Sequence, residues 1–464
     1  MTEGVPLTGP TRRIHFVGVG GAGMSAIAKV LIETGATVTG SDLKWSRPMT
    51  LLEAMGAQLH EGHDAALVEG ADAVVFSSAI PERNPELVAA RAAGISLMSR
   101  GEALAALLVG TRSIVVAGTH GKTTTTSMIV SILKHAGLDP TYLVGGGLNE
   151  AGTNARLGSS DIIVAESDES DGSFLLLDPW VGVVTNVEMD HVDHWGSMES
   201  LTAAFVSFLG SVRTGGTAVI STQAHVLLPD APRGVETVIT GAEAGGDDAG
   251  ISAEGIVADS GGMRFTLAMP SGAAPVALRV PGHHNVQNAL SAAGAARCLG
   301  LEVGIIASGL SSFRGVERRY HLKGTAGGVT IIDDYAHHPT EVRATLNAAR
   351  NTGPGRVVAV FQPHRFTRTL ALWREFGHAF ADADRVVITD VYGAGEEPLP
   401  GVTGKLIADA VCTALPGRPV AYMPRRDELL SFLSSSSRPG DTVLTMGAGD
   451  ITSIGEELIE ALEL

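Results

Sequence analysis

A turn with the sequence Gly-Thr-His-Gly-Lys-Thr lies at residues 118–123. The apolar, β-branched run before it (114–116) predicts a strand, and residues 124–133 after it predict a helix. A strand, a glycine-rich turn and a helix N-terminus together surround phosphate groups with backbone N–H donors. Lys122 would then reach the β- and γ-phosphates of a nucleotide, and the Thr123 hydroxyl would bind Mg²⁺. The common phosphate loop has four residues between its first glycine and Gly-Lys, whereas this one has two.

A second glycine-rich turn, Gly-Val-Gly-Gly-Ala-Gly at residues 18–23, follows a predicted strand at 14–19. Asp42 lies 19 residues beyond Gly23, at the end of the next predicted strand. This spacing matches the dinucleotide fingerprint, whose glycines let the backbone approach a pyrophosphate. Any nucleotide diphosphate has that group, so the pattern favours a diphosphate site over a nicotinamide site; a tight turn without a ligand is the alternative. Two phosphate sites in one chain disfavour a simple dehydrogenase.

Acidic residues follow the predicted strand at 161–166, which ends in Glu166. A carboxylate at the end of a strand beside a phosphate loop is the usual partner of its Mg²⁺. Asp168, Glu169 and Asp171 come next, and such an acidic run is more commonly a solvated loop. We expect Glu166 to bind the metal and interpret Asp168 and Asp171 as loop residues.

Histidines and acids also follow a predicted strand at 183–186. Asp190, His191, Asp193 and His194 are residue types that bind a metal or orient a phosphate. A single surface histidine usually does neither. The position directly after a strand favours a functional role for one of them, above all His191.

Two asparagines lie at the start of the helix predicted at 285–298. Asn285 and Asn288 are three residues apart and therefore share one helical face. An asparagine amide pairs bidentately with the N6/N7 edge of adenine. The pair predicts an adenine site, and capping of the helix by Asn285 is the alternative.

Polar clusters mark the last part of the chain. Arg318 and Arg319 precede it, and the predicted strands at 329–332 and 357–361 are followed by two groups: Asp333, Asp334, Tyr335, His337 and His338, then His364, Arg365 and Arg368. Arginines at a strand end suit a carboxylate or phosphate because they form bidentate contacts. Loop arginines are mostly solvated, but three polar groups in one small domain favour a binding site.

The elements that position these groups alternate between strand and helix in three segments, which predict domains at residues 1–110, 111–322 and 323–464. Further strands are predicted at 37–40, 73–77, 386–389 and 442–446, short strands between 218 and 278 around a loop at 241–250, and a loop at 434–440. The alternation predicts three α/β domains with parallel sheets, Rossmann-like at both ends with a phosphate-loop domain between them.

Composition limits the classes of function. At 464 residues the chain is too long for one hydrophobic core, and its net charge of −17 argues against a nucleic-acid surface. Cys298 and Cys412 lie in apolar, helical stretches, which predicts buried free thiols in a cytosolic protein. Residues 1–11 lack an apolar signal core, and no run of about 18 apolar residues occurs. We expect a cytoplasmic protein without membrane insertion.

Five motifs, taken in order, closely resemble those of the Mur ligases over nearly the whole chain. They are Gly-Val-Gly-Gly-Ala-Gly-Met from Gly18, Gly-Thr-His-Gly-Lys-Thr-Thr-Thr-Thr from Gly118, Glu-Ser-Asp-Glu-Ser-Asp-Gly-Ser-Phe from Glu166, Asp-Asp-Tyr-Ala-His-His-Pro from Asp333 and Phe-Gln-Pro-His-Arg-Phe-Thr-Arg-Thr from Phe361. The short phosphate loop is this family's form. The resemblance implies an N-terminal domain for a UDP-sugar, a central domain for ATP and a C-terminal domain that closes over both.

The resemblance also implies roles for individual residues. Those expected at ATP are Gly118, Thr119, His120, Gly121, Lys122, Thr123, Thr124, His284, Asn285, Asn288, Arg319 and Asp334. Those expected at Mg²⁺ are Thr123, Glu166 and His191. Those expected at the UDP end are Gly20, Gly21, Ala22, Gly23, Asp42 and His63, and those at the sugar carboxylate and the amino acid are Tyr335, His337, His364, Arg365 and Arg368. The expected catalytic set is Lys122, His191, His337, Arg365 and Arg368, with His337 as the candidate base.

Within the family, the motifs are most similar to those of members that join L-alanine to UDP-N-acetylmuramate through an acyl phosphate. Several relatives have a carbamylated lysine after the His191 loop, but residues 192–212 contain no lysine, as in the alanine-adding members. Rival interpretations are a sibling ligase that attaches a tripeptide, a folate-type glutamate ligase, a dehydrogenase fused to an ATPase, and a nucleotide switch. We expect UDP-N-acetylmuramate and L-alanine as partners, no nucleic acid, and a monomer or weak dimer.

Overall fold

The computed structural model describes residues 7–9, 11–148, 153–241, 250–259 and 261–463. Its first part is a five-stranded parallel sheet in the order β3-β2-β1-β4-β5. The strands are β1 (Arg13–Val17), β2 (Thr37–Asp42), β3 (Gln58–Glu61), β4 (Ala73–Phe76) and β5 (Ser96–Ser99). The helices of this part are α1 (Ala22–Glu33), α2 (Arg47–Ala54), α3 (Pro85–Ala93) and α4 (Arg100–Leu108), with a 3₁₀ turn, η1 (Ala65–Val68).

The central part contains a ten-stranded sheet in the order β15-β14-β13-β12-β11-β10-β6-β9-β7-β8. Its strands are β6 (Arg112–Ala117), β7 (Thr141–Leu148), β8 (Thr153–Arg156), β9 (Ile162–Glu166), β10 (Val181–Val184), β11 (Thr217–Ser221), β12 (Glu236–Gly241), β13 (Ile251–Asp259), β14 (Gly262–Met269) and β15 (Gly272–Leu278). Its helices are α5 (Lys122–His135), α6 (Val192–Trp195), α7 (Met198–Gly210), α8 (Thr222–His225), α9 (His283–Arg297) and α10 (Val303–Ser312), with η2 (Ser173–Leu176).

The C-terminal part contains a six-stranded sheet in the order β16-β17-β21-β18-β19-β20. Its strands are β16 (His321–Ala326), β17 (Val329–Asp334), β18 (Val357–Phe361), β19 (Arg385–Ile388), β20 (Val420–Tyr422) and β21 (Thr442–Met446). Its helices are α11 (Pro339–Thr352), α12 (Phe366–Ala379), α13 (Lys405–Ala414), α14 (Arg426–Ser436) and α15 (Thr452–Glu463).

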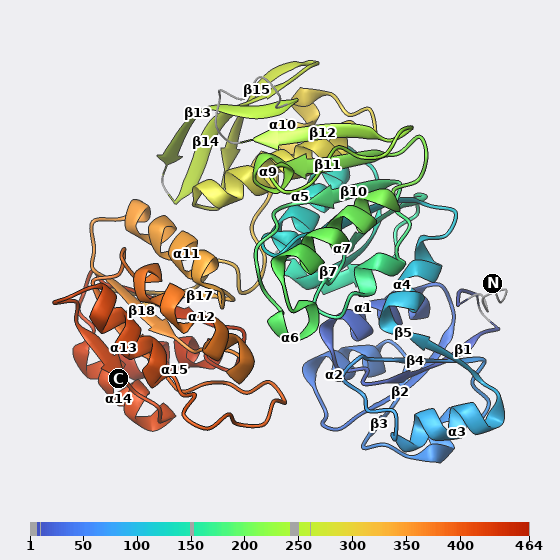
Figure 1. Ribbon diagram of the computed structural model, residues 1–464, viewed down its shortest axis with the longest axis horizontal. Helices are drawn as coiled ribbons and strands as arrows, with labels where there is room; N and C mark the ends of the chain where they lie inside the picture. Colours follow the sequence, from blue (N-terminus) through green and yellow to red (C-terminus); the bar gives the residue numbers. More distant parts are fainter. Residues whose placement is uncertain (1–6, 10, 149–152, 242–249, 260, 464) are drawn as a thin grey trace.

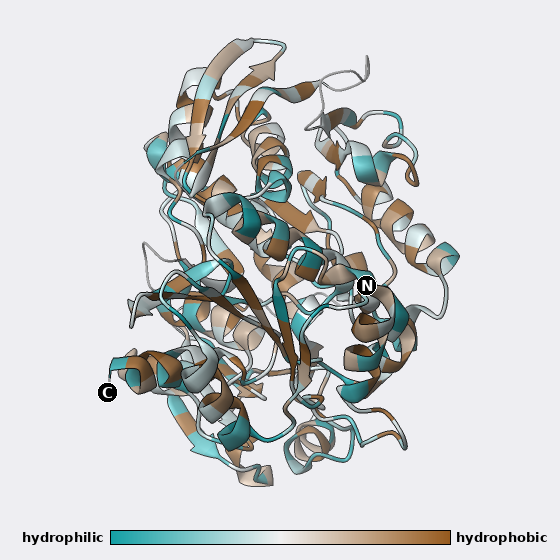
Figure 2. Cartoon of the chain, turned by 90° about the vertical axis from the view of Figure 1, so that its left-hand side faces the viewer, coloured by the Kyte–Doolittle hydropathy of each residue, from teal (hydrophilic) through white to brown (hydrophobic). Residues whose placement is uncertain are grey.

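Burial explains why the inner strands are continuous apolar runs. All five residues of β18, Val-Val-Ala-Val-Phe, are buried. Alternate residues belong to two hydrophobic clusters, one on each face of the sheet. A strand covered by helices on both faces has no solvent side, so it needs apolar residues at every position. Figure 2 shows hydrophobic residues concentrated along such inner strands, while the helices carry hydrophilic outer faces.

The three-domain α/β class is confirmed, but the expectation of purely parallel sheets is wrong at three places in two of the sheets. In the central sheet β13, β14 and β15 pair antiparallel, and so do β7 and β8. In the C-terminal sheet β16 is antiparallel to β17. Along the chain β14 lies two residues from β13 and two from β15, and it alternates largely between buried and more exposed residues. Short turns permit antiparallel hairpins, whereas parallel pairs need a crossover.

Two smaller expectations are also corrected. The predicted loop at 434–440 begins too early, because α14 continues to Ser436 and buries Leu429 and Leu433 on its inner face. Cys298 and Cys412 are free thiols, but neither is fully buried: Cys298 is half-buried and Cys412 is exposed on α13. The loop predicted at 241–250 lies mostly outside the described residues. Among the described helices, none has the length and hydrophobicity needed to cross a bilayer.

The three parts surround a common central region (Figure 1). The N-terminal and C-terminal sheets lie on the same side of the central one, and the short helix α6 lies between the three. The carboxyl ends of β6, β9 and β10 lead into the loops that face this region. Ligands bind at such strand ends in open parallel sheets. We therefore expect a ligand site at the loops after these strands.

Candidate active site

The phosphate loop joins β6 to α5 as the sequence predicts. Gly118 has φ of +135° and Gly121 has φ of +77°, conformations that L side chains rarely adopt. The Nζ atom of Lys122 donates to the carbonyl oxygens of Gly118 (2.6 Å) and Thr119 (3.2 Å) and to Oε2 of Glu169 (2.7 Å). The lysine therefore lies folded over its own loop, surrounded by oxygen atoms.

The ion pair between Lys122 and Glu169 is almost completely enclosed. The Glu169 side chain is 3 % exposed and that of Lys122 15 %. Burial opposes the charge of Lys122, but the carboxylates of Glu169 and Asp168 outweigh it and raise the pKa of the lysine. Burial raises the pKa of Glu169 to about 7, although Lys122 counteracts that shift. The lysine keeps its positive charge, and Glu169 is the nearest of the carboxyl groups around it.

The residues predicted to bind Mg²⁺ are only partly together. The Thr123 hydroxyl donates to Oε1 of Glu166 at 2.9 Å, and Oε2 of Glu166 accepts the backbone N–H of Gly145 at 2.6 Å. His191 lies beyond Glu169, with Nε2 3.8 Å from Oε1 of that carboxylate. Burial lowers the pKa of His191, so its imidazole is neutral near pH 7. Hydroxyl and carboxylate oxygens suit a magnesium ion, and a neutral imidazole is able to coordinate a metal.

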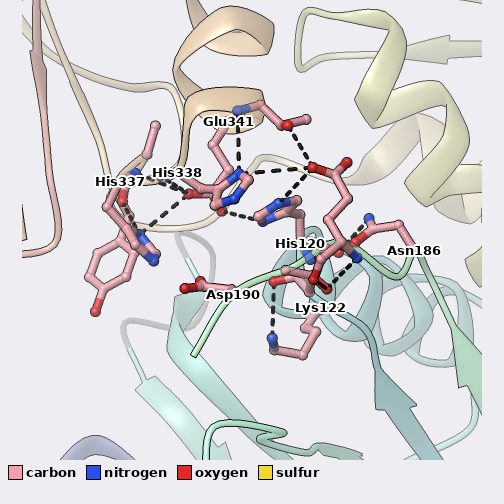
Figure 3. Close-up of polar contacts among 12 residues, drawn as sticks. His120, Lys122, Asn186, Asp190, His337, His338 and Glu341 are labelled. Carbon is pink, nitrogen blue, oxygen red and sulfur yellow. Dashed lines mark hydrogen bonds and ion pairs between the residues drawn. The ribbon is translucent and has the colours of Figure 1, made fainter. Parts of the chain in front are cut away.

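Charged contacts connect the central part with the C-terminal part, and Figure 3 shows those around His120 and Glu341. Asp190 after β10 accepts two hydrogen bonds from the Arg368 guanidinium on α12, at 2.9 and 3.1 Å. Both side chains are buried, at 7 % and 6 % exposure. Burial opposes ionisation of Asp190, but Arg368 and His191 hold the pKa of that acid far below its usual range. Buried charges of this kind persist only when paired.

His120 of the phosphate loop makes a second connection. Its Nδ1 lies 3.3 Å from Glu341 on α11, and its Nε2 lies 3.6 Å from Glu188 after β10. Burial disfavours the charged ring, but Glu341 and Glu188 outweigh that and raise the pKa of His120 to about 9. Glu188 also accepts a hydrogen bond of 2.6 Å from the Thr340 hydroxyl. Burial raises the pKa of Glu188, but His120 and Thr340 more than offset this and lower it to about 2.

A cavity of about 1280 Å³ extends from the phosphate loop to the C-terminal part. The predicted nucleotide residues that line it are His120, Gly121, Thr124, His284, Asn285, Asn288, Arg319 and Asp334. Gly118, Thr119, Lys122 and Thr123 lie in the same loop and the first turn of α5. The volume lies above the usual range of small-molecule pockets, which is about 300–1,000 Å³. The predicted residues therefore converge on one cavity from both parts of the molecule.

The two asparagines lie against the phosphate loop. Asn285 donates its amide to the Pro281 carbonyl at 2.7 Å, and Asn288 donates to Oδ1 of Asn285 at 3.2 Å. A side chain on Gly121 would collide with the Asn288 amide. The N-cap of α9 is Gly282 rather than Asn285, so the capping alternative is not what the structure shows. Neighbouring His284 is neutral, because burial lowers its pKa to about 4.

The acid and arginine at the start of the C-terminal part form a compact group. Asp334 accepts backbone N–H bonds from Tyr320 and Ala336, both at 2.7 Å. Burial raises the pKa of Asp334 to about 6, although Arg319 counteracts the shift. The guanidinium of Arg319 lies 5.0 Å from the centre of the Tyr335 ring. Asp334 and Arg319 face the nucleotide cavity, whereas Tyr335 packs beneath the arginine.

The predicted carboxylate-binding residues are gathered at the interface between the two parts. His337 and His364 are neighbours, with ring centroids 5.9 Å apart. Burial lowers the pKa of His337 to about 4 and that of His364 to about 3, so both rings are neutral. Arg365 begins α12 with φ of +67° and keeps 34 % of its side chain exposed. Arg368, in contrast, is occupied by Asp190, so a substrate carboxylate would have to share it.

The predicted UDP-binding residues lie in the N-terminal part, away from the cavity. The N–H of Gly20 donates to Oδ2 of Asp42 at 2.9 Å, so Asp42 holds the glycine-rich loop. Gly21 is the N-cap of α1, and Ala22 and Gly23 form its first turn. A buried acid positions the His63 ring, because Nδ1 of His63 lies 3.0 Å from Oε1 of Glu86.

Comparison with known proteins identifies the family. Family models match residues 13–112 as the Mur ligase family catalytic domain, 116–296 as the Mur ligase middle domain and 318–449 as the Mur ligase glutamate ligase domain. The chain is similar to a UDP-N-acetylmuramate–L-alanine ligase of Rubrobacter xylanophilus, with 48 % identity covering 97 % of this chain and 100 % of that protein. A ligase of the same name from Desulforamulus reducens is 45 % identical over 98 % and 99 % of the two chains. The chain is a Mur ligase.

Solved structures agree with this assignment. The UDP-N-acetylmuramate–alanine ligase MurC of Thermotoga maritima is similar with a TM-score of 0.80 and 29 % identity, covering 97 % of this Mur ligase and 98 % of that chain. A murein peptide ligase of Psychrobacter arcticus follows with a TM-score of 0.72 and 26 % identity, covering 97 % and 99 %. The similarity extends over all three parts of the molecule.

Several residues of this Mur ligase site do not stand out in the sequence. Glu169, Glu188 and Glu341 neutralise Lys122 and His120, but each lies in a different segment of the chain. Glu169 belongs to the acidic run after β9, which could have drawn attention to it. Two other acids of that run pair with Arg100, whose Nη2 lies 3.4 Å from Asp168 and 3.2 Å from Asp171. No local pattern signals Glu188 or Glu341.

Proposed function

We propose that this Mur ligase uses ATP to join L-alanine to the lactyl carboxylate of UDP-N-acetylmuramate. The observation that carries the proposal is the identity of 45–48 % over nearly full length with relatives named for that reaction. The phosphate loop, the buried lysine and the cavity beside them supply the chemistry that such a ligase requires. The product would be the first amino-acid adduct of a peptidoglycan precursor.

The first step would transfer a phosphoryl group to the substrate. A lactyl carboxylate oxygen attacks the γ-phosphorus of ATP, the bond to the bridging oxygen breaks, and ADP leaves with its electron pair. Lys122 neutralises charge on the transferred group, and Arg365 orients the attacking carboxylate. Phosphoryl transfer needs little covalent chemistry from the protein, so positioning of the two anions is its main contribution.

The second step would form the amide. The alanine nitrogen attacks the acyl carbon, the bond from that carbon to the phosphate oxygen breaks, and inorganic phosphate leaves. The amine must lose a proton, and the neutral ring of His337 is the candidate acceptor. With a pKa of about 4, this histidine is free to accept a proton at pH 7 but is a weak base. The bound anionic substrates would strengthen it.

A magnesium ion fits the residues at the phosphate loop. The Thr123 hydroxyl and the Glu166 carboxylate lie 2.9 Å apart, and both are oxygen donors of the type that Mg²⁺ prefers. Thr123, Glu166 and His191 would hold the ion, which would offset repulsion between the phosphates and the substrate carboxylate. Glu166→Gln should therefore raise the Mg²⁺ concentration that half-saturates activity by at least about tenfold. An unchanged Mg²⁺ titration would remove Glu166 from this role.

The decisive assay measures phosphate release in the presence of ATP, UDP-N-acetylmuramate and one amine at a time. The proposal expects release that depends on both the sugar nucleotide and L-alanine. The similarity to a murein peptide ligase over 97 % of the chain supports one alternative, a sibling that attaches a peptide. Turnover with L-alanyl peptides and none with L-alanine would establish that alternative and overturn the first proposal.

We also propose the wider setting of the enzyme. The first domain boundary, at 110/111, falls in the turn between α4 and β6. The second is better placed just before His321 than at 322/323, because β16 begins there and pairs with β17 of the C-terminal sheet. A cytoplasmic monomer or weak dimer agrees with the phosphorylated substrates and the net charge of −17. Gel filtration of the purified protein tests the oligomeric state.

A further inference from the structure

Three potential metal ligands meet where the central and C-terminal parts touch. His120 comes from the phosphate loop, Glu188 from the loop after β10, and His338 from the residue that caps α11. One ligand atom of each lies within 4.8 Å of the ligand atoms of the other two. None of the three is among the residues expected to hold Mg²⁺. The cluster is thus separate from the site at Thr123 and Glu166.

The distances within the cluster approach those around a bound cation. Nε2 of His120 is 3.6 Å from Oε2 of Glu188, and Nδ1 of His338 is 3.9 Å from the same oxygen. In a tetrahedral zinc site with bonds of about 2.0–2.1 Å, neighbouring ligand atoms are about 3.3 Å apart. The three ligand atoms lie within 4.8 Å of one another, so they would have to approach one another further to hold the ion. The two imidazole rings already lie together, with centroids 4.6 Å apart.

Unsatisfied nitrogens point to a missing partner. Nε2 of His120 and Nε2 of His338 are both buried and have no hydrogen bond within the described part of the chain. The side chain of His120 is 10 % exposed and that of His338 is 6 %. Buried polar atoms without partners are uncommon, because they lose water and gain nothing in return. Of the two, Nε2 of His120 is the atom that faces Glu188, at 3.6 Å, and that a bound cation would satisfy. His338 faces the same carboxylate with Nδ1, so its Nε2 is not a ligand atom of the cluster.

The surroundings also resemble a metal site. Nδ1 of His120 lies 3.3 Å from Oε1 of Glu341. In metal sites a coordinating histidine typically donates its other nitrogen to a carboxylate, which fixes the ring. Glu188 and Glu341 together supply two negative charges around His120. Imidazole ligands with one carboxylate select zinc-like cations over Mg²⁺, which prefers oxygen.

We propose that His120, Glu188 and His338 form a binding site for a nitrogen-preferring divalent cation such as Zn²⁺, which ties the phosphate loop to the start of α11. The nucleotide cavity, which His120 and Glu188 line, would supply the fourth position. Coordination by His338 would cost one long capping bond, from the Thr340 N–H to Nδ1 at 3.3 Å. The other cap, from the His338 N–H to Glu341 at 3.2 Å, would remain. The site goes beyond the proposed ligase reaction, and its occupancy is measurable without turnover.

The test uses Co²⁺ as a spectroscopic probe of the full chain in excess Mg²⁺. Bound to two imidazoles and a carboxylate, Co²⁺ gives visible absorption bands that Zn²⁺ abolishes by competition. His338→Asn keeps a side chain that is able to cap α11, and Glu188→Gln keeps an acceptor for Thr340. His225→Asn is the matched control, because that histidine faces a single carboxylate, Asp230, at 3.9 Å. His191→Asn reports on binding at the magnesium ligands.

We expect His338→Asn and Glu188→Gln each to weaken Co²⁺ binding by at least about tenfold, while His225→Asn and His191→Asn bind as the unmodified protein does. Zn²⁺ should also raise the Tm of the unmodified protein and of the two controls, but not that of the site variants. Absence of bands in the unmodified protein overturns the proposal. Bands lost only in His191→Asn place the cation at the magnesium ligands, and bands kept in every variant show surface binding; both outcomes also overturn it. Because two site variants are measured separately, misfolding of one leaves the other decisive.

Discussion

Among single residues, Lys122 has contacts that a bound nucleotide would have to replace. The ammonium group is already surrounded by two carbonyl oxygens and Glu169, at 2.6–3.2 Å. These oxygens satisfy the lysine when no phosphate is bound. An incoming triphosphate must compete with Glu169 for the same charge. We therefore expect Glu169 to lower the affinity for ATP, although the acid need not contact the nucleotide.

Replacement of Lys122 separates its chemical role from its structural one. Lys122→Met should lower kcat for phosphate release by at least about a hundredfold, since charge on the transferred phosphoryl group is no longer neutralised. It should also lower Tm, because Glu169 loses its buried partner. Adding Glu169→Gln removes that unpaired acid, so the double variant should regain Tm but not activity. Recovery of turnover in the double variant would show that Lys122 only balances Glu169.

Arg365 offers a sharper test of carboxylate binding than Arg368. Its guanidinium is 3.7 Å from Asp193 and 3.9 Å from Glu396, and a third of the side chain is exposed. Arg365→Ala should raise KM for UDP-N-acetylmuramate or L-alanine by about tenfold or more, the loss expected for one charge-assisted hydrogen bond. The matched control is Arg374→Ala, whose guanidinium stacks on Trp373 of the same helix. A change in KM for ATP alone would argue against carboxylate binding by Arg365.

At the scale of elements, one buried carboxylate joins three of them in the N-terminal part. Glu86 on α3 accepts from Nε2 of His15 on β1 (2.9 Å) and from the Ser41 hydroxyl on β2 (2.8 Å), and it also contacts His63. Its side chain is completely buried. Burial disfavours its charge, but the hydrogen bonds from His15 and Ser41 outweigh that and lower its pKa below 4.5. The predicted UDP residue His63 thus rests on a structural acid.

The pH dependence of stability follows from this lowered pKa. A depressed carboxyl pKa stabilises the fold above about pH 4.5, and the gain is lost as pH falls through the folded-state value. Glu86→Ala should cost about 1–3 kcal/mol for each buried partner left without its acceptor. The difference in unfolding free energy from the unmodified protein should be largest at neutral pH and shrink below pH 4.5. A difference that stays constant from pH 7 to pH 3 would contradict the role of ionised Glu86.

Secondary structure elements differ in how far their sequences predict them. Strands β18 and β21 match their predicted bounds, because a strand buried on both faces is an unbroken apolar run. The direction of β13–β15 is not contained in such runs, since pairing depends on distant segments. The serines of α14 suggest a loop, but burial of Leu429 and Leu433 holds them in the helix. The sequence does not predict that Glu188 and Glu341 pair with His120, because only folding brings them to 3.6 and 3.3 Å from it.

At the scale of the whole molecule, the central and C-terminal parts meet through charged and polar contacts. Arg368 binds Asp190, His120 lies between Glu188 and Glu341, and Thr340 donates to Glu188. Such contacts are directional and reversible, which suits parts that must separate to exchange ligands. An acyl phosphate formed between them would react with water if the parts separated early. We therefore expect closure of the two parts to control how efficiently phosphorylation is coupled to amide formation.

Asp190→Asn tests this coupling, because it removes the charge that pairs with Arg368 and leaves the shape of the side chain. The weakened interface should open more frequently and admit water to the acyl phosphate. We expect the ratio of phosphate released to alanine incorporated to rise above one, together with faster hydrogen exchange in α11 and α12. The control is Asp409→Asn, which breaks an exposed pair with Lys405 inside α13 and should leave the ratio unchanged. If turnover falls in Asp190→Asn but the ratio stays equal to one, the Asp190–Arg368 pair positions substrate instead of excluding water.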